Sequence, residues 1–97
     1  MSRRAIKWTK RALRRLDQVG ATIAEDNIAA ASTVIARMVA SVELLAQRPA
    51  MGRVGRVNGT RELVIDALPY IIPYRVKETT IEIITIMHTA QKWPKDF

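Results

Sequence analysis

Cysteine is absent from this 97-residue sequence, and histidine occurs only once, at position 88. Without cysteine the chain has neither a disulfide framework nor a thiolate zinc site. A single histidine would need clustered carboxylates to hold a metal, and the sequence offers no such cluster. No apolar run reaches about 18 residues, and the basic N-terminus lacks the apolar core of a signal peptide. We therefore expect a cytoplasmic protein with no metal site and no membrane span.

Acidic residues are missing from the first 16 positions, although the whole chain carries nine of them. The other 81 residues hold nine cations and nine acids, so the net charge of +7 comes from the N-terminus. A second local excess lies between Arg48 and Arg61. Clustered positive charge attracts a polyanion or an acidic protein over long range, but a solvated face that aids solubility is an equally good interpretation of the N-terminal cluster. Its seven members are Arg3, Arg4, Lys7, Lys10, Arg11, Arg14 and Arg15.

Glycine is scarce, and three of the four glycines fall in one stretch, GRVGRVNGTRELV at 52–64. A phosphate-binding P-loop needs G-x-x-x-x-G-K-[ST] between a strand and a helix, and this stretch has neither the lysine nor the setting. The dinucleotide pattern G-x-G-x-x-G is also absent. We therefore expect no cofactor. The stretch is interpreted as a flexible crossover in which Arg53 and Arg56 pair with phosphates or carboxylates of a target.

The first half of the chain has helical periodicity. A short strand is expected at 4–8, and Thr9 is a suitable N-cap for a helix that begins at Lys10. A second helix is expected from Ile28 to about Gln47, after caps at 26–27, and the short linker predicts an antiparallel hairpin. The apolar stripes that support the two helices are Leu13, Leu16, Val19 and Ile23 in the first and Ala31, Ile35, Met38, Val42 and Leu45 in the second.

After Pro49 the pattern favours strands. Three segments rich in β-branched and aromatic residues, at 61–66, 70–77 and 80–88, predict an antiparallel meander. Pro73 cannot donate a ladder hydrogen bond, so it indicates a bulge or an open side. The predicted fold class is α+β in a single domain over 1–97, ordered β-α-α-β-β-β, with the helical hairpin packed on one face of a small antiparallel sheet. The other face is expected to be open or shallow.

Side-chain alternation within these strands suggests candidate site residues. Arg61, Arg75 and His88 converge at one end of the sheet only if the strand register permits, and sequence alone does not fix that register. Ion pairing of the arginines with Glu62, Asp66 or Glu82 is the commoner role of a strand arginine. A lone histidine at a strand end is also more often structural than catalytic.

Several segments in order resemble the RelE/ParE superfamily of bacterial type II toxins. They are AEDN…AA at the helix junction, LLAQRPAMGRVGR after the second helix, and GTRELVI…LPYIIPYRV…IEIITIMHTAQKWP through the strands. The resemblance covers almost the whole chain, and the superfamily shows the same β-α-α-β-β-β layout. It implies a toxin that arrests bacterial growth and a cognate antitoxin that neutralises it. The charge favours an acidic antitoxin segment that is disordered alone and folds as it binds.

The resemblance implies three alternatives for the molecular activity. RelE-like members cleave mRNA in the ribosomal A site without a metal, leaving a 2′,3′-cyclic phosphate. ParE-like members inhibit DNA gyrase and are not known as enzymes. A third reading is a non-catalytic partner that binds only its antitoxin and, through it, operator DNA in an autorepressing complex.

For the RelE-like reading, which we expect first, the resemblance implies a set of site residues. Arg61 and Arg75 would bind the phosphate and stabilise its charge, and His88 would transfer protons. Gln91 and Lys92, in the tail, would contact the target together with Arg53 and Arg56. The tail has no tyrosine, which RelE-like nucleases often carry there, and this departure keeps the gyrase alternative open.

Overall fold

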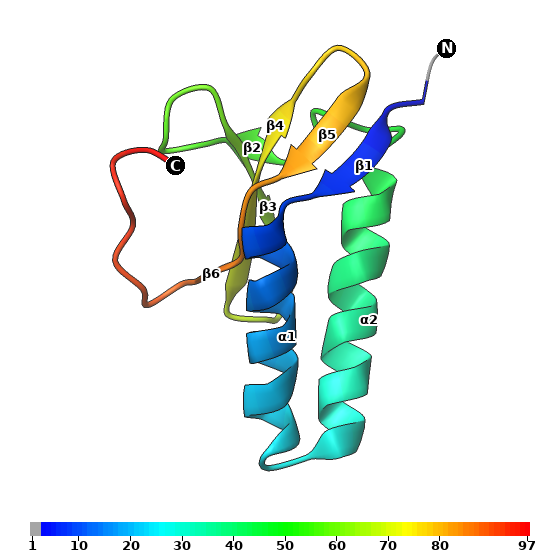
Figure 1. The fold of residues 1–97 in the computed structure, drawn as a ribbon, viewed down its shortest axis with the longest axis vertical. Coiled ribbons are helices and arrows are strands. Elements are labelled where there is room, and N and C mark those ends of the chain that lie inside the picture. The colour runs from blue at the N-terminus through cyan, green and yellow to red at the C-terminus, as the bar shows by residue number, and fades with distance from the viewer. Residues whose placement is uncertain (1–2) are drawn as a thin grey trace.

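Two antiparallel helices pack along one face of a six-stranded sheet in the computed structural model, which describes residues 3–97 (Figure 1). Neither helix within these residues is long and apolar enough to cross a membrane. In chain order the elements are β1 (Ala5–Trp8), α1 (Lys10–Ala24), α2 (Ile28–Leu44), β2 (Arg53–Val54), β3 (Arg61–Val64), β4 (Tyr70–Val76), β5 (Thr80–Ile83) and β6 (Met87–His88).

Both helices begin at the predicted caps. The Thr9 hydroxyl accepts a hydrogen bond from the Ala12 N–H at 3.0 Å, and the Asn27 side chain accepts one from the Ala30 N–H at 3.0 Å. These bonds satisfy backbone donors that have no partner within the helix. α2 ends at Leu44, three residues before the expected end, because a tighter turn begins where the Leu45 N–H bonds to the Val42 carbonyl at 3.0 Å.

The sheet has the strand order β1-β5-β4-β3-β2, and β6 also pairs with β4. The predicted α+β class is confirmed, but the sheet is mixed rather than antiparallel throughout, since β1 runs parallel to β5. The helical hairpin supplies the long connection that a parallel neighbour requires. It carries the chain away from β1, so that β5 later pairs beside β1 with Ala5 opposite Thr80.

The strand expected at 80–88 is divided into β5 and β6 by a bulge. Tyr74 of β4 lies opposite Ile83, whereas Ile71 lies opposite Met87, so the later strand has one extra residue over this span. Pro73 lies within the span and uses its carbonyl, which accepts the Ile84 N–H at 3.0 Å. The bulge predicted from Pro73 therefore occurs, in the strand that faces it.

β1 is too short to pair with the bulged segment, and α1 takes its place. The Thr9 hydroxyl donates to the Ile84 carbonyl at 2.8 Å, and the Arg15 Nε donates to the Ile86 carbonyl at 3.1 Å. These two bonds anchor the N-terminal half of α1 beside the strand that leads to β6.

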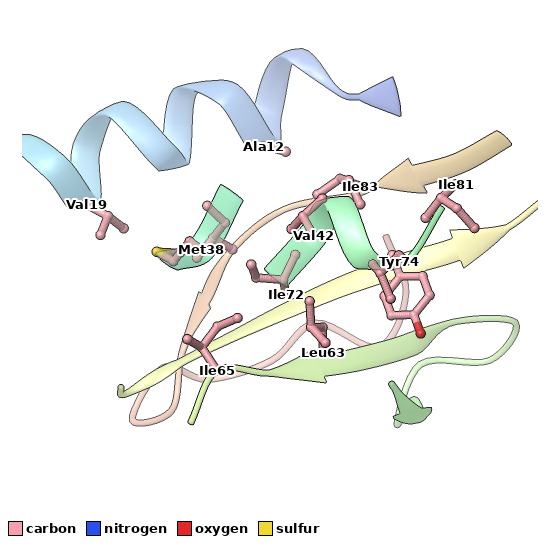
Figure 2. Close-up of a cluster of buried hydrophobic side chains, with 12 residues drawn as sticks. Ala12, Val19, Met38, Val42, Leu63, Ile65, Ile72, Tyr74, Ile81 and Ile83 are labelled. Carbon is pink, nitrogen blue, oxygen red and sulfur yellow. The ribbon is translucent and has the colours of Figure 1, made fainter. Parts of the chain in front are cut away.

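The main core lies between the hairpin and the sheet (Figure 2). The predicted α2 stripe is confirmed, with Met38, Val42 and Leu45 fully buried. On α1 the prediction is partly wrong: Ala12 and Val19 are buried, whereas Leu13 is 47% exposed. Sheet residues that close this core include Leu63, Ile72, Tyr74, Ile81, Ile83 and Ile86.

The opposite face of the sheet is not open, which corrects the expectation from sequence. Its apolar side chains Ile71, Pro73, Ile84 and Met87 are buried although they point away from the helices. The loop between β2 and β3 and the C-terminal tail cover this part of the face, and Val57 of the loop is itself buried. The half of the face near β1 stays more exposed, around Arg75 and Lys77.

Candidate functional site

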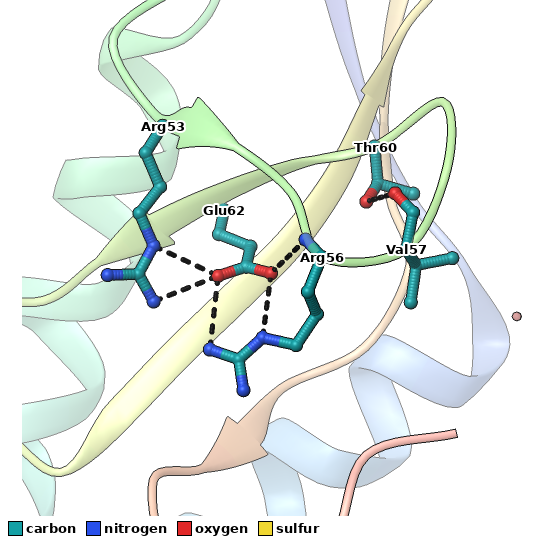
Figure 3. A network of polar contacts seen from close by, with 5 residues as sticks. All are labelled: Arg53, Arg56, Val57, Thr60 and Glu62. Atoms are coloured by element: carbon teal, nitrogen blue, oxygen red, sulfur yellow. Dashed lines mark hydrogen bonds and ion pairs between the residues drawn. The ribbon is translucent and has the colours of Figure 1, made fainter. Parts of the chain in front are cut away.

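Glu62 of β3 is the centre of a polar cluster that we call the Glu62 cluster, made of Arg53, Arg56 and Glu62 (Figure 3). The carboxylate is 1% exposed, on the face away from the helices. It accepts the Arg53 Nε at 3.0 Å and Nη2 at 2.9 Å. It also accepts the Arg56 backbone N–H at 2.8 Å and Nε at 3.1 Å. Two arginines predicted to contact a target are thus paired with an acid of their own chain.

The Glu62 carboxylate is charged despite its burial. Burial alone would raise the pKa of Glu62, because a low dielectric disfavours the ionised form. The backbone and side-chain hydrogen bonds from Arg56, and those from Arg53, outweigh this effect and lower the pKa below its ordinary value. The cluster therefore persists as a buried carboxylate held by two half-exposed guanidinium groups.

The glycine-rich stretch forms the turn that builds this cluster. The Gly55 N–H donates to the Thr60 carbonyl at 2.8 Å, and the Thr60 hydroxyl donates to the Val57 carbonyl at 2.6 Å (Figure 3). Gly59 adopts φ of 76°, a left-handed conformation that favours glycine. The stretch is the predicted crossover between α2 and β3, but hydrogen bonds hold it where a flexible segment was expected, and its arginines turn back onto Glu62.

Arg61 lies on the other face of β3 and supports the crossover. Its Nε donates to the Gly52 carbonyl at 2.8 Å, and its Nη2 donates to the Ala50 carbonyl at 3.2 Å. The neighbouring Tyr74 hydroxyl donates to the Pro49 carbonyl at 2.8 Å and accepts the Gly52 N–H at 2.9 Å. A Cβ on Gly52 would lie 2.6 Å from that hydroxyl and 2.7 Å from the Glu62 carbonyl oxygen, so only glycine fits there.

Arg75 is held by Glu82 on the adjacent strand. Its Nη1 lies 3.3 Å from the Glu82 carboxylate, which Lys77 also contacts at 3.2 Å. Burial would raise the pKa of Glu82, but the hydrogen bonds from Lys77 and Arg75 outweigh it and lower that pKa. Arg75 thus has the ion-pair role that is the commoner one for a strand arginine.

His88 ends β6 beside Tyr70, whose ring meets the imidazole edge-on with centroids 5.5 Å apart. The His88 Nδ1 accepts the Ala90 N–H at 3.0 Å, so the neutral ring carries its proton on Nε2. The Gln91 side chain accepts the His88 backbone N–H at 3.2 Å and closes the same turn. Lys92, next in the chain, is exposed and forms no ion pair within residues 3–97.

The candidate catalytic residues do not converge. Arg61 lies opposite Tyr74, and the next residue, Arg75, therefore points to the other face of the sheet. His88 lies opposite Tyr70, five residues along β4 from Arg75, or about 16 Å at the usual rise per residue. A single phosphate cannot contact all three groups in this arrangement.

A stack of guanidinium and aromatic groups, which sequence reasoning missed, fastens the C-terminal tail. The Arg56 guanidinium lies 3.7 Å from the centre of the Trp93 ring, and Trp93 meets Phe97 at 6.3 Å. The Arg11 guanidinium of α1 lies 5.7 Å from the centre of Phe97. Because tail and crossover are far apart in sequence, no local pattern could reveal these contacts.

Exposed apolar side chains gather at what we call the β2–β3 edge. Leu44, Met51, Val54 and Val64 are 38–77% exposed there. Three of them, Leu44, Met51 and Val64, line a cleft of about 410 Å³ between α2 and β3. An exposed strand edge with apolar side chains is typical of a surface that binds a protein segment. Within residues 3–97, no three histidine or acidic side chains gather as a metal site would require.

Comparisons with known proteins give consistent matches. The family model described as the ParE toxin of the type II toxin–antitoxin system parDE matches residues 6–93. Y4kP, a candidate toxin of Sinorhizobium fredii, is 54% identical over 95 residues that cover 98% of each chain. Toxin RelE2 of Caulobacter vibrioides is 33% identical over 86 residues, 89% of this chain and 96% of that protein. The chromosomal ParDE system of P. aeruginosa matches with a TM-score of 0.80 and 28% identity, over 88% of this chain and 95% of that chain.

Proposed function

The chain belongs to the ParE toxin family of type II toxin–antitoxin systems, and we propose that it arrests growth by binding DNA gyrase rather than by cleaving RNA. Membership implies a cognate antitoxin as its partner. ParE-like members of the superfamily inhibit gyrase without being known as enzymes, so the proposal requires a binding surface and no reacting groups.

The observation that carries the proposal is the engagement of the arginines within the fold. Arg53 and Arg56 pair with Glu62, Arg75 pairs with Glu82, and Arg61 holds backbone carbonyls. Cleavage of RNA needs several such groups aimed at one phosphate, in a geometry set before the reaction begins. These guanidinium groups are instead committed to stabilising the crossover and the sheet, which suits a binding protein.

The main alternative to the proposal is that the protein cleaves RNA as RelE-like members do. It keeps His88, whose Nε2 is available for a proton transfer, and it agrees with the name of the RelE2 relative. For RNA cleavage on the ribosome, Arg61 would have to leave the Gly52 carbonyl, or Arg75 would have to leave Glu82. The autorepression reading, in which the protein only binds its antitoxin on operator DNA, predicts no growth arrest at all.

One experiment separates the three readings. The chain is expressed briefly without its antitoxin, and RNA ends and plasmid supercoiling are measured in the same culture. We expect growth arrest, loss of negative supercoiling and intact mRNA, with rescue when the neighbouring antitoxin gene is co-expressed. Codon-phased mRNA cuts with normal supercoiling would replace the gyrase proposal by the RelE-like one. Unimpaired growth at full expression would leave only the antitoxin-binding role.

A further inference from the structure

The exposed side of α1 carries four cations, Lys10, Arg11, Arg14 and Arg15, which we call the α1 basic face. At 100° per residue these four side chains fall within an arc of about 140° around the helix. Lys10, Arg11 and Arg14 are exposed, and Arg15 is partly exposed because it also bonds to the Ile86 carbonyl. The buried Ala12 and Val19 lie outside this arc, beyond Arg15.

The charge of this face is not neutralised within the fold. Within residues 3–97, the four ion pairs involve only Arg53, Arg56, Arg75 and Lys77 as cations. The first turn of α1 has no acid, and the positive end of the helix dipole lies at the same end. Asp17, the one acid in α1, lies about 20° outside the arc and forms no ion pair within residues 3–97.

The C-terminal tail meets the same face at Arg11. The contact between Phe97 and Arg11 brings the end of the tail against α1. The tail carries Lys92 and Lys95, both exposed, and only one acid, Asp96. The stack of Arg56, Trp93 and Phe97 holds the tail, and with it the contact between Phe97 and Arg11.

The α1 basic face has the composition of a phosphate-binding surface more than that of a protein interface. A protein segment that folds on binding needs apolar anchors, and α1 itself offers no large apolar side chain within the arc. Leu13, the one large exposed apolar residue of α1, lies beyond its edge. The exposed apolar residues are concentrated at the β2–β3 edge instead. A phosphate backbone is bound mainly through charge.

We propose that the α1 basic face binds the backbone of duplex DNA, so that the toxin contacts DNA directly. The choice of duplex DNA rests on the proposed function, because a protein bound to gyrase lies next to the duplex that gyrase handles. The binding itself needs neither gyrase nor a particular base sequence.

The test is equilibrium binding of the full-length chain to a labelled 20-base-pair duplex of arbitrary sequence, by fluorescence anisotropy over a range of salt concentrations. With about four phosphate contacts, the logarithm of the binding constant should fall with log salt at a slope near −4. Arg11→Gln/Arg14→Gln should weaken binding about tenfold or more and reduce the slope by about 2. The matched control, Arg48→Gln/Lys77→Gln, removes the same charge elsewhere and should leave binding within about twofold.

Circular dichroism and thermal unfolding first establish that both double variants are folded. Equal losses in the two variants would overturn the proposal, since binding would then reflect net charge and not this face. Tighter binding of poly-glutamate than of duplex DNA, weakened only by the Arg11/Arg14 variant, would overturn it in favour of an acidic protein partner. Either failure leaves the gyrase proposal standing, because no gyrase is present in the assay.

Discussion

At the residue scale, Glu62 is buried although its position in a strand would place it in water. Alternation places it on the face away from the helices, where a charged side chain would normally meet water. The crossover instead folds over it and supplies Arg53 and Arg56 as partners. A buried carboxylate stabilises a fold only while its hydrogen-bond partners remain in place. Glu62 therefore couples the shape of the crossover to the stability of the sheet.

The first prediction concerns the pH dependence of stability through Glu62. Its folded pKa is lowered from 4.5, so its stabilisation is complete above that value and is lost as the pH falls from about 5 through the folded pKa. At pH 7, Glu62→Gln should reduce the free energy of unfolding by about 2 kcal/mol, because charge-assisted hydrogen bonds are lost. Urea unfolding at pH 7 and at pH 3 should show this gap closing.

Glu78 provides the control for that measurement. It is exposed and forms no ion pair within residues 3–97, so Glu78→Gln should change the unfolding free energy little at either pH. The wild-type contribution of Glu82 cancels in the comparison, since both variants retain it. A gap between wild type and Glu62→Gln that is equally large at pH 3 would contradict the assignment of the lowered pKa.

The second prediction concerns the Tyr74 hydroxyl, which bonds to both the Pro49 carbonyl and the Gly52 N–H. Tyr74→Phe should destabilise the protein by about 1–3 kcal/mol, since two backbone groups lose their partner in a buried place. Tyr70→Phe is the matched control, because no hydrogen bond of the Tyr70 hydroxyl occurs among the described residues, and should cost less than about 0.5 kcal/mol. Equal losses in urea unfolding would show that the hydroxyl of Tyr74 has no special role.

At the scale of elements, local sequence signals predicted the helices, whereas strand pairing in the sheet depends on residues far apart in the sequence. Caps at Thr9 and Asn27 and a clean α2 stripe are properties of neighbouring residues, and all are found. The parallel pairing of β1 with β5 joins segments more than 70 residues apart, and no local pattern carries it. The bulge was indicated by Pro73, but the strand that holds the extra residue depends on the pairing register.

The covered face of the sheet is a second example. Ile71, Ile84 and Met87 are buried on the face that we expected to be open or shallow. The cover is the loop between β2 and β3 together with the tail, which is held by the stack of Trp93 on Arg56 and of Phe97 on Arg11. Cation–π contacts depend on which rings and cations meet in space, so composition alone does not predict them.

The third prediction tests this tail as an element. Trp93→Ala should lower the free energy of unfolding by about 1–2 kcal/mol, from lost ring burial and the lost contact with Arg56. Hydrogen exchange should increase at 87–97 and remain unchanged in α2. Trp93→Phe should retain most of the stability, because the indole N–H has no hydrogen-bond partner in the structure. Protection of 87–97 that survives Trp93→Ala would refute the fastening role of the stack.

At the scale of the whole molecule, the family was predictable and the site geometry was not. The order of weak motifs indicated a RelE/ParE toxin, and the family match over residues 6–93 confirms it. The sequence also indicated the types of residue in the candidate site, including Glu62 and Glu82 as ion-pair partners. Their arrangement depends on the strand register, which places Arg61 and Arg75 on opposite faces and His88 at the far end of β4.

The fourth prediction follows from that dispersion. If the toxin acts by binding, Arg75→Gln and His88→Ala should each arrest growth as fully as wild type when expressed at equal level. The RelE-like alternative predicts that at least one of them abolishes arrest, since removal of a catalytic proton-transfer group typically costs about 100-fold or more in rate. Growth curves with immunoblots for expression decide between the two outcomes.

The most direct test of the central claim is a supercoiling assay with purified components. Relaxed plasmid, DNA gyrase and ATP are incubated with the purified full-length chain, and the topoisomers are resolved on a gel. We predict inhibition of supercoiling that increases with toxin concentration, that Arg75→Gln and His88→Ala preserve, and that equimolar cognate antitoxin abolishes. Full supercoiling activity in the presence of excess folded toxin would contradict inhibition of gyrase by this protein.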